Sequence, residues 1–368
     1  MYDKLDKFHD PRQASKITYP LSDLLLISLF AICQGAETWR QIVIWAETHQ
    51  YWLRDYIDTS LGVPSYSTIR RIFTLIKPEQ FQCLLDEILD FHGSNKQTED
   101  HIAVDGKTLR GSRCTSKNIP AMQMVSAFSV ENQMTLAQVK TNCKSNEINA
   151  IPLLLDLLNI EDTTISIDAA GCQKSIMSMI VNKKAHYVVG LKMNQPKLFQ
   201  SVSSYFHEEL NHLNHKVQDE FDDGHGRLVR RRYFVCSLPE HLKDPSFPEM
   251  KTAIAVERIS RQHNQSAEDV VTNWHYYVTN HGDKNSKLPS YIRKHWQIES
   301  YHWLLDVHLS DDKDKKYEAN SAENFNRVRR FLLNLVKSKT WTGKKESIKS
   351  KLKRIGWDLN LLPELLFG

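Results

Sequence analysis

Residues 101–112 read HIAVDGKTLRGS, and residues 163–173 read TTISIDAAGCQ. Each stretch opens with a short apolar, β-branched run typical of a buried strand, and the run ends at an aspartate, Asp105 or Asp168. A carboxylate at the end of a strand projects at the edge of the sheet, so adjacent strands that end in Asp can present oxygens to one cation. Glu299, in the helical stretch YIRKHWQIESYHWLLDV at 291–307, is the third such carboxylate. Together they predict a fold that gathers distant acidic side chains around metal ions.

The elements around the two aspartates predict a mixed sheet. The first strand, at 102–105, is followed by a hairpin, MQMVSAFSV and MTLAQVKT, that turns at 131–133. Helices over about 147–158 and 173–182 then alternate with the strands TTISID and HYVVGLK. Three strands, helix, strand, helix, strand is the ribonuclease-H-like order, with helices on the faces of the sheet.

The rest of the chain completes a mixed α/β (α+β) architecture of three parts. Residues 1–95 show apolar spacing near 3.6 and predict a helical N-terminal domain. Residues 100–194 and 291–368 form the ribonuclease-H-like catalytic domain, with a basic C-terminal segment. Residues 195–290 delay the helix of Glu299 and contain strand-like runs, so they predict a β-rich insertion before that last catalytic helix.

Composition and charge narrow the class of protein. The 368 residues are 41% hydrophobic and 25% charged, as in ordinary globular proteins. There is no run of about 18 apolar residues that could cross a membrane, so we expect a cytoplasmic protein. The net charge is +4, but residues 313–354 hold 14 Lys and Arg against 4 Asp and Glu. This basic segment predicts a surface that meets phosphate, although a solvated helix face would have the same composition.

The three carboxylates suit metal-dependent phosphodiester chemistry. Mg²⁺ accepts a few carboxylate ligands while keeping water, and two such ions can activate a nucleophile and stabilise the leaving oxygen. An Asp after a strand is also a common turn residue, because its side chain bonds to the local backbone. Neither aspartate decides the function by itself.

Longer motifs carry a resemblance over nearly the whole chain. They are DPR at 10–12, GVPSYSTIRRIF at 62–73, VDGKTLRGS at 104–112, VSAF at 125–128, KSNEI at 144–148, IDAAGCQ at 167–173, LKMNQP at 191–196, GHGR at 224–227 and RKHWQIESYHWLLDVHLSDD at 293–312. With these motifs the chain resembles DDE transposases of the H-repeat-associated insertion-sequence family.

The resemblance implies an activity, a cofactor and partners. Asp105, Asp168 and Glu299 would be the catalytic, metal-binding triad, with two Mg²⁺ ions for which Mn²⁺ can substitute. The substrate would be double-stranded DNA, both element ends and target, bound by a homo-oligomer at the bacterial nucleoid, with no membrane involved. Metal-dependent hydrolysis at element ends would be followed by 3′-hydroxyl strand transfer. The alternatives are a domesticated or inactive DNA-binding relative and a stand-alone metal-dependent nuclease.

The helix of Glu299 departs from the wider group. That group often has Tyr, Arg and Lys around the final Glu, in a Y-x2-R-x3-E-x6-K spacing. Here Ile292, His295 and Asp306 occupy those positions, and Arg293 could supply the cation instead. On one helix His295, Glu299, His302 and Asp306 would share a face. A transition-metal site is conceivable from that spacing, but a packed helix near the Mg²⁺ site is the better interpretation.

Further side chains are expected to contact DNA. They are Lys107, Arg110, Lys192, Asn194 and Gln195 near the active edge, Arg293 and His295 beside Glu299, Arg230 in the insertion, and Arg70 and Arg71 in the N-terminal domain. The last two lie in a stretch that resembles the second helix of a helix-turn-helix, capped by Ser65. Ordinary exposed loop, strand and helix residues are the alternative for each. Glu147 is a candidate fourth carboxylate.

Overall fold

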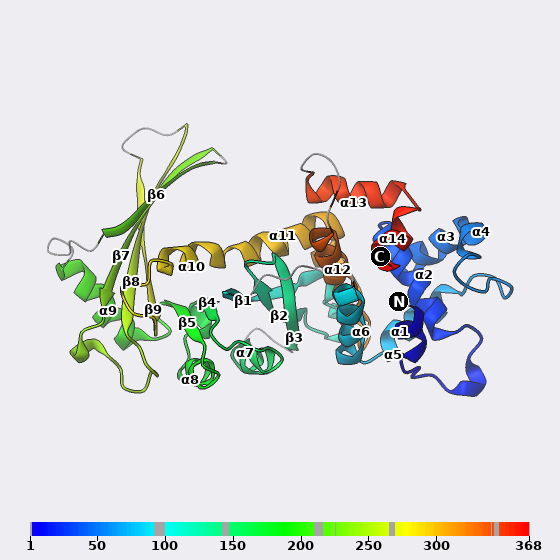
Figure 1. The fold of residues 1–368 in the computed structure, drawn as a ribbon, viewed down its shortest axis with the longest axis horizontal. Helices are drawn as coiled ribbons and strands as arrows, with labels where there is room; N and C mark the ends of the chain where they lie inside the picture. The colour runs from blue at the N-terminus through cyan, green and yellow to red at the C-terminus, as the bar shows by residue number, and fades with distance from the viewer. Residues whose placement is uncertain are drawn as a thin grey trace.

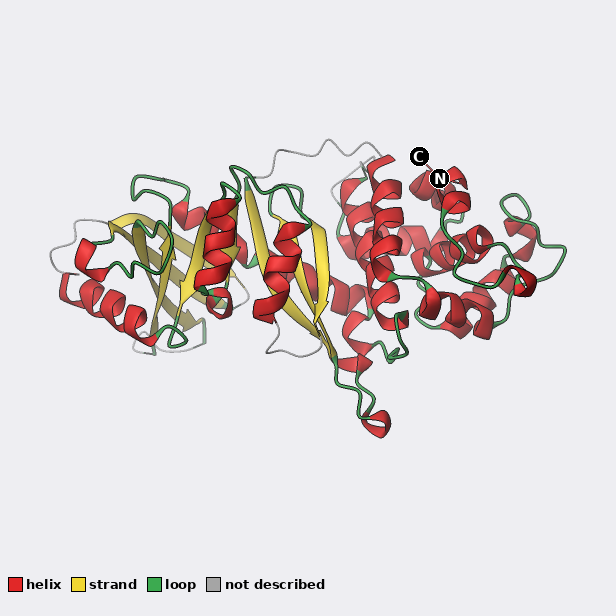
Figure 2. Ribbon diagram, turned by 90° about the horizontal axis from the view of Figure 1, so that it is seen from below, coloured by secondary structure: helices red, strands yellow, loops and turns green. Residues whose placement is uncertain are grey.

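The computed structural model describes residues 2–91, 100–141, 147–209, 216–224, 226–264, 269–339, 341 and 346–367. An all-helical half lies at one end of the elongated molecule and a single sheet fills the rest (Figures 1 and 2). In the described part of the chain no helix is long and apolar enough to span a membrane.

The helical half is built from both ends of the chain. Its helices are α1 Tyr2–Lys7, α2 Leu21–Cys33, α3 Trp39–Thr48, α4 Gln50–Leu53, α5 Tyr66–Leu75, α6 Pro78–Phe91, α12 Ser321–Ser338, α13 Ile348–Trp357 and α14 Leu361–Phe367. They share one hydrophobic core, in which α2 is buried on nearly every side. The two termini lie close together there (Figure 1). The last three helices therefore pack with the N-terminal helices.

The sheet has nine strands in the order β3-β2-β1-β4-β5-β9-β8-β7-β6. Their bounds are β1 His101–Leu109, β2 Met122–Ser129, β3 Met134–Thr141, β4 Thr164–Ile167, β5 His186–Leu191, β6 Lys216–Gly224, β7 Arg227–Ser237, β8 Thr252–Gln262 and β9 Val271–Thr279. The first three strands are antiparallel neighbours, and β1, β4 and β5 run parallel. This confirms the ribonuclease-H-like order predicted from the sequence.

Helices cover both faces of the sheet. α7 Glu147–Asp156 and α8 Lys174–Asn182 lie on one face, and α10 Leu288–His295 and α11 Gln297–Leu309 run nearly end to end across the other (Figure 1). α7 and α8 share a core with the inner strands because β-branched and apolar residues dominate both. The face that carries α10 and α11 is the one on which the predicted carboxylates lie.

The β-rich insertion is continuous with the sheet of strands β1 to β5. It begins with α9 Pro196–Glu209, and its last strand, β9, pairs antiparallel with β5 from Val188↔Thr279 to Leu191↔Tyr276. β8, β7 and β6 then extend the same sheet outward and project beyond the body of the molecule (Figure 1). The insertion thus adds strands to the existing sheet and forms no separate layer.

The predicted basic surface at 313–354 divides into two parts. The whole of α12 from Ser321 to Val336 is buried, including Arg327, Arg329 and Arg330. Arg327 pairs with Glu323 on the same helix. Arg329 pairs with Asp311 and Asp314, in the segment that precedes this helix. The expectation that this part of the segment meets phosphate is therefore wrong, because its arginines are held inside the protein. The lysines of α13 are treated below.

Candidate active site

Asp105 lies within β1, level with the end of the neighbouring strand. β1 and β4 run parallel, and their register pairs Val104 with Ile167, the last residue of β4. β1 continues to Leu109 along β2, where Asp105 is paired with Ser126. The predicted end of the first strand at Asp105 is therefore wrong, because only β4 ends at this level. Asp105 keeps 25% of its side-chain area exposed beside that end.

Asp168 follows β4 directly and caps the short helix η5, Ala169–Gly171. Its Oδ1 accepts hydrogen bonds from the backbone N–H of Ala170 at 3.0 Å and of Gly171 at 3.4 Å. These bonds orient the carboxylate at the turn that leaves the sheet. Asp105 and Asp168 therefore lie on adjacent parallel strands, as the sequence predicted.

Asn194 and Gln195, predicted as DNA contacts, bond to the loop that follows Asp168. The Asn194 side-chain amide donates to the carbonyl oxygen of Ala169 at 2.5 Å, and that of Gln195 donates to the carbonyl oxygen of Cys172 at 2.8 Å. Their amide donors are engaged with protein backbone. In this conformation they support the Asp168 loop, while their neighbour Lys192 is exposed.

Glu299 stands in the first turn of α11 with an exposed side chain. Trp296 joins α10 to α11 in a helical conformation, so the two helices run almost as one. Three contacts bind this pair of helices to the sheet: His295 with Ser166, His302 with Asp105, and Asp306 with Lys107. They fix the height and rotation of α11 over β1 and β4, and so the place of Glu299.

His295 belongs to a buried hydrogen-bonded network under α10. Its Nδ1 lies 2.8 Å from the Ser166 hydroxyl, which lies 2.7 Å from Nε2 of His101. Burial lowers the pKa of His295 to about 4, although the charge of Asp168 opposes this shift. His295 is thus neutral and enclosed by protein. The prediction that His295 contacts DNA is wrong for this conformation, because its buried ring cannot reach a phosphate.

Lys107 supplies the cation that the helix lacks at position 306. Its Nζ lies 2.5 Å and 2.6 Å from the two carboxylate oxygens of Asp306, and only 8% of its side-chain area is exposed. Where the wider group often has Lys on the helix, this chain pairs an Asp there with a Lys from β1. Lys107 is therefore bound to α11 and is not available to DNA in this conformation, contrary to the prediction.

The carboxylates influence one another's ionisation. The pKa of Asp105 is raised to about 7, first by burial and then by the negative charge of Asp168, with smaller contributions from Glu299 and Glu147. The backbone N–H of Gly106 opposes this shift. Burial also raises the pKa of Glu299. Side chains from four distant parts of the sequence thus contribute negative charge to one region.

The donor set fits Mg²⁺. Among the described residues, no three His, Cys, Asp or Glu side chains converge tightly enough to hold an ion in this conformation. Carboxylate oxygens are nevertheless the ligands that Mg²⁺ prefers. A cation among them would relieve the repulsion that raises the pKa of Asp105. The alternative of a His-containing transition-metal site has no support among the described residues, since His295 is bonded to Ser166 and His302 is buried.

Glu147 approaches the site through a gap left by a glycine. A Cβ on Gly106 would lie 2.6 Å from Oε1 of Glu147, so the absence of a side chain there makes room for this carboxylate. Glu147 opens α7, between β3 and β4 in the chain. The preceding motif residues 144–146 lie outside the described residues.

The other predicted DNA contacts lie on the surface and mostly in ion pairs. Arg110 is 83% exposed beside Asp312, Arg70 lies 3.3 Å from Glu318, Arg230 pairs with Asp219, and Arg293 lies 3.3 Å from Asp222. Arg71 is exposed on α5, whose N-terminus is capped by Ser65 as expected. Exposed pairs of this kind are worth little and exchange readily for a phosphate.

A basic cavity that the sequence did not predict lies between the insertion and α10. It has a volume of about 310 Å³ and is lined by Arg231, Tyr233, Val256, Arg258, His275, Tyr277, Ile292, Arg293 and Trp296. We call it the arginine cavity. Arg231 and Arg258 are directly opposite on β7 and β8, and no described residue forms an ion pair with Arg258. Burial and the charges of Arg293 and Arg258 lower the pKa of Arg231, although Asp222, 3.7 Å from Arg231, opposes this shift. Because three arginines line the cavity, it favours an anion.

The sequence held one signal for this cavity. Along β8 the residues that face α10 are apolar at Ile254 and Val256 and then become Arg at 258. A period-2 strand pattern that changes from apolar to cationic on one face marks the place where packing ends and a binding surface begins. Only strand pairing could show that Arg231 faces Arg258.

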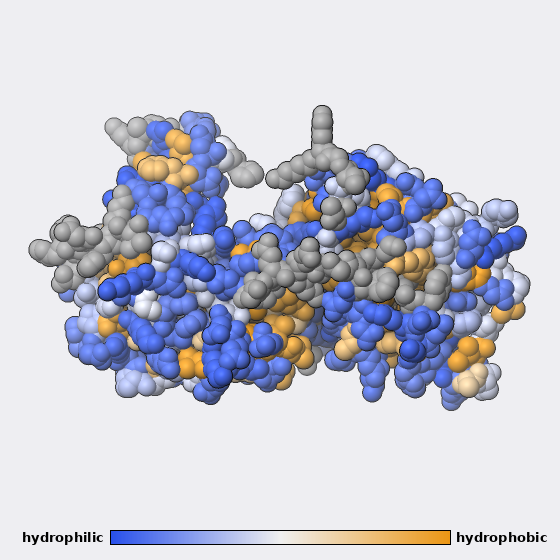
Figure 3. Space-filling view, in the orientation of Figure 1, coloured by the Kyte–Doolittle hydropathy of each residue, from blue (hydrophilic) through white to orange (hydrophobic). Residues whose placement is uncertain are grey.

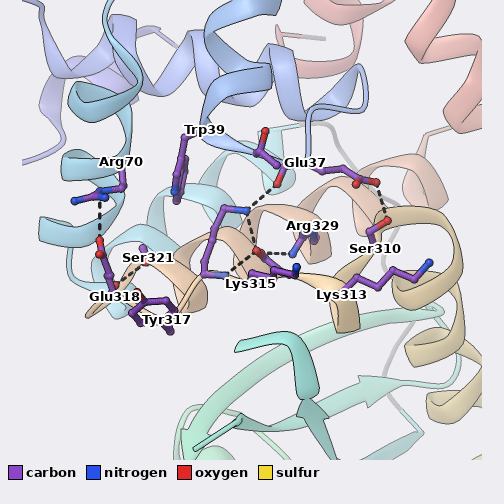
Figure 4. A pocket seen from close by; sticks show the side chains of 13 residues that line it. Glu37, Trp39, Arg70, Ser310, Lys313, Lys315, Tyr317, Glu318, Ser321 and Arg329 are labelled. Atoms are coloured by element: carbon purple, nitrogen blue, oxygen red, sulfur yellow. Dashed lines mark hydrogen bonds and ion pairs between the residues drawn. The ribbon is translucent and has the colours of Figure 1, made fainter. Parts of the chain in front are cut away.

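A larger cavity, of about 470 Å³, lies away from the carboxylates, where the chain after α11 meets the N-terminal helices (Figure 4). Lys316 projects into this junction, with its ammonium 2.9 Å from Asp314 and 2.8 Å from the carbonyl oxygen of Glu37. It also lies over the rings of Trp39 and Phe325. These interactions join the helical half to the segment that follows α11.

Comparison with known proteins agrees with the geometry. Residues 96–335 match the family described as transposase DDE domain, and residues 2–87 match the family described as DDE_Tnp_1-associated. The chain is 35% identical to the putative protein YbfL of Escherichia coli strain K12, over 98% of this chain and 95% of that protein. It is 34% identical, with the same coverage, to the H repeat-associated putative transposase YhhI of that strain.

The chain also aligns with solved structures. A piggyBac transposase synaptic complex with hairpin DNA aligns over 100% of this chain and 79% of that chain, at 10% identity and a TM-score of 0.43. This similarity is too low to inform the site.

The fold and the grouped carboxylates define a ribonuclease-H-like protein of the polynucleotide-processing type. The family match spans most of the chain, including all three carboxylates. The chain belongs to the DDE transposase family, in its H-repeat-associated group. The resemblance read from the motifs is confirmed.

Proposed function

We propose that this transposase uses Asp105, Asp168 and Glu299 to cut DNA. It then joins the freed 3′-hydroxyl to target DNA. The observation that carries the proposal is the arrangement of three elements: Asp105 on β1 and Asp168 at the end of β4 lie on adjacent parallel strands, and the contacts of α10 and α11 with these strands hold the helix of Glu299 over them. Residues this far apart in sequence come together only because β1, β4 and α11 meet at one place. That arrangement matches the three carboxylates that the family resemblance assigns.

Asp105, Asp168 and Glu299 would hold two Mg²⁺ ions, for which Mn²⁺ would substitute. Such ions supply activation of the attacking hydroxyl and stabilisation of the leaving oxygen. The protein's own part is positioning. The backbone of η5 orients Asp168, and the contacts of α10 and α11 with the sheet hold Glu299 opposite Asp105.

The DNA strand would be bound by exposed cations. Lys192 and Arg293 are exposed, and the arginine cavity adds Arg231 and Arg258 on the face that carries α10. Arg230 comes one residue before Arg231 on β7, so it would contact DNA from the other face of the sheet. Arg70, Arg71 and Arg110 would contact more distant phosphates. The partner is double-stranded DNA at the bacterial nucleoid, and we propose that a homo-oligomer forms on it, because element ends must be brought together for joining.

The test is incubation of the purified protein with the DNA that flanks its gene, in Mg²⁺, with nicked and joined products mapped by sequencing gels. We expect Asp168→Ala to abolish cleavage and to leave DNA binding within about threefold, because the variant loses one exposed carboxylate and no cation. The matched control is Asp156→Ala, which removes a surface carboxylate that pairs with Lys183 on the opposite face.

The outcomes separate the alternatives. Cleavage by Asp168→Ala at the wild-type rate would overturn the assignment of the site. DNA binding by wild type with no nicking in Mg²⁺ or Mn²⁺ would identify a DNA-binding relative. Nicked products without joined products would identify a stand-alone nuclease.

A further inference from the structure

The outer face of α11 is an exposed stripe that contains the proposed catalytic glutamate. Trp303 and Val307 are 57% and 52% exposed, and they follow Glu299 at steps of four residues, so the three share one face of the helix. Trp296, 44% exposed, begins the stripe one turn before Glu299. Large apolar side chains that are exposed next to one another often mark a binding surface.

The stripe connects two cavities. At its N-terminal end Trp296 lines the arginine cavity. At its C-terminal end Val307 and His308 line a second cavity, of about 360 Å³, whose other walls are formed by the end of α2 and by α13 with Lys349, Lys353 and Trp357. We call this the lysine cavity. Figure 3 shows the surface hollowed over α10 and α11, between the projecting strands of the insertion and the part of the molecule that contains α13.

α13 presents only positive charge. Its sequence, IKSKLKRIGW, has four cations and no acidic residue. Arg354 pairs with Glu346, but no described carboxylate pairs with Lys349 or Lys353. The Lys353 ammonium lies 5.6 Å from the ring centre of Trp357, which is 80% exposed. The charge of Lys349 adds to the effect of burial in lowering the pKa of His308, so the cation lies close to the stripe.

We propose that the lysine cavity and the C-terminal half of the stripe bind the backbone of duplex DNA that continues past the cleavage site. The inference rests on the proposed function for the position of the cut. Unpaired cations beside exposed aromatic side chains fit a polyanion. A second copy of the chain would have to bring a complementary acidic, apolar surface to the same cations.

The length of α11 predicts how far along the DNA this surface lies from the cleavage site. Glu299 and Val307 are eight residues apart, or about 12 Å along α11. At about 3.4 Å per base pair that distance corresponds to about three to four base pairs. The lysine cavity should therefore contact phosphates that begin about three to four base pairs from the scissile position.

The test compares two double variants that each remove two lysines. One is Lys349→Ala with Lys353→Ala, and the matched control is Lys174→Ala with Lys183→Ala at the two ends of α8, on the opposite face (Figure 1). Affinity for a fluorescein-labelled 40-base-pair duplex of the gene's flanking DNA is measured by anisotropy from 50 to 200 mM salt. All proteins also carry Asp168→Ala, so that the DNA stays intact.

We expect the α13 variant to bind about tenfold more weakly at 100 mM salt. Its slope of log affinity against log salt should fall by about two, one for each phosphate that the variant no longer neutralises. The control should stay within about twofold of its parent. Hydroxyl-radical footprints should shorten by several base pairs at one end only in the α13 variant.

Equal affinity and equal footprints in the two variants would overturn the inference. So would a DNA-free dimer in sedimentation that only the α13 variant loses, because it would assign the surface to a second copy. These measurements need no cleavage. Cleavage is judged separately, in the protein with Asp168 intact. If that protein never cuts DNA while the binding series behaves as expected, the proposed function is removed and this surface stays assigned. If it cuts while the α13 variant keeps its footprint, the reverse holds.

Discussion

α12 and α13 are neighbouring basic helices with opposite surroundings. Arg327, Arg329 and Arg330 of α12 are 3–4% exposed and bond to protein groups. Lys349 and Lys353 of α13 face solvent beside exposed tryptophan, with no carboxylate partner among the described residues. Because these two helices are similar in charge and differ in burial, local charge alone does not identify a DNA surface. The acidic residues that fold against each helix decide whether its cations are structural or available.

The partners of α12 lie in the turn after α11. Arg329 lies 2.6 Å from Asp314 and 3.5 Å from Asp311, and the Asp311 carboxylate also accepts two hydrogen bonds from Asn326 at 2.9 Å. Asn324 donates to the carbonyl oxygens of Phe73 and Ile76 in the helical half. α12 therefore connects α11 with the N-terminal helices, and its charges act within that connection.

The largest effect is expected from breaking a buried pair of α12. Arg329→Ala leaves the carboxylates of Asp311 and Asp314 inside the protein without their main cation, which should cost about 3–5 kcal/mol in the free energy of unfolding. Urea denaturation followed by circular dichroism measures it. Arg354→Ala on α13 is the matched control and should cost less than about 1 kcal/mol, since that arginine is 50% exposed. Similar losses in both variants would contradict the comparison.

An intermediate effect is expected where the two helices meet. Lys337 of α12 lies over the rings of Phe128 and Tyr301, and its pKa is lowered to about 8 by burial and by the charge of Lys351 on α13. Lys337→Met removes a partly buried cation and should stabilise the fold by about 1–2 kcal/mol at pH 7, after allowance for the cation–π interactions that it removes.

The pH dependence of that variant has a definite sign. Below pH 8 Lys337 is charged in both the folded and the unfolded chain, so the full cost of burying the charge is present. Between pH 8 and 10.5 the folded chain gives up the proton first, and the wild type gains stability relative to Lys337→Met. The advantage of methionine should shrink over this window in thermal melts. A constant difference from pH 7 to 10 would show that Lys337 is not strained by burial.

The smallest effect on stability is expected from the exposed lysines. Lys349→Ala with Lys353→Ala should change the free energy of unfolding by no more than about 0.5 kcal/mol, because no described carboxylate loses a partner. The measurement is the same urea titration. A loss above about 2 kcal/mol would place these lysines with the structural cations of α12.

The sequence predicted much of the fold because local patterns were strong. The β2–β3 hairpin, the strands β4 and β5 and the helices α7 and α8 appear where period-2 and period-3.6 patterns indicated. β1 was predicted too short, since Gly106 and Lys107 look like a turn although they pair with β2. The partners of Lys107 and His295 could not be predicted, because each contact joins residues more than 100 positions apart.

Some residues of the candidate site were predicted from local sequence and others were missed. Asp105, Asp168 and Glu299 were found from strand context and motifs, and the structure brings their charges into one region. Arg258 was missed because its meaning depends on Arg231 across β7 and β8, and Trp296 because a tryptophan in a helix usually packs in a core. Long-range pairing creates both features, and no local window contains it.

The pairing of β9 with β5 has a mechanical consequence. Among the described residues, backbone hydrogen bonds connect each neighbouring pair of strands from β1 and β4 to β6, the outermost strand of the insertion. A force applied at its tip is transmitted as twist through the whole sheet to the strands that carry Asp105 and Asp168. We therefore expect the protein to stay rigid when it binds DNA, so that most of the change in shape occurs in the DNA.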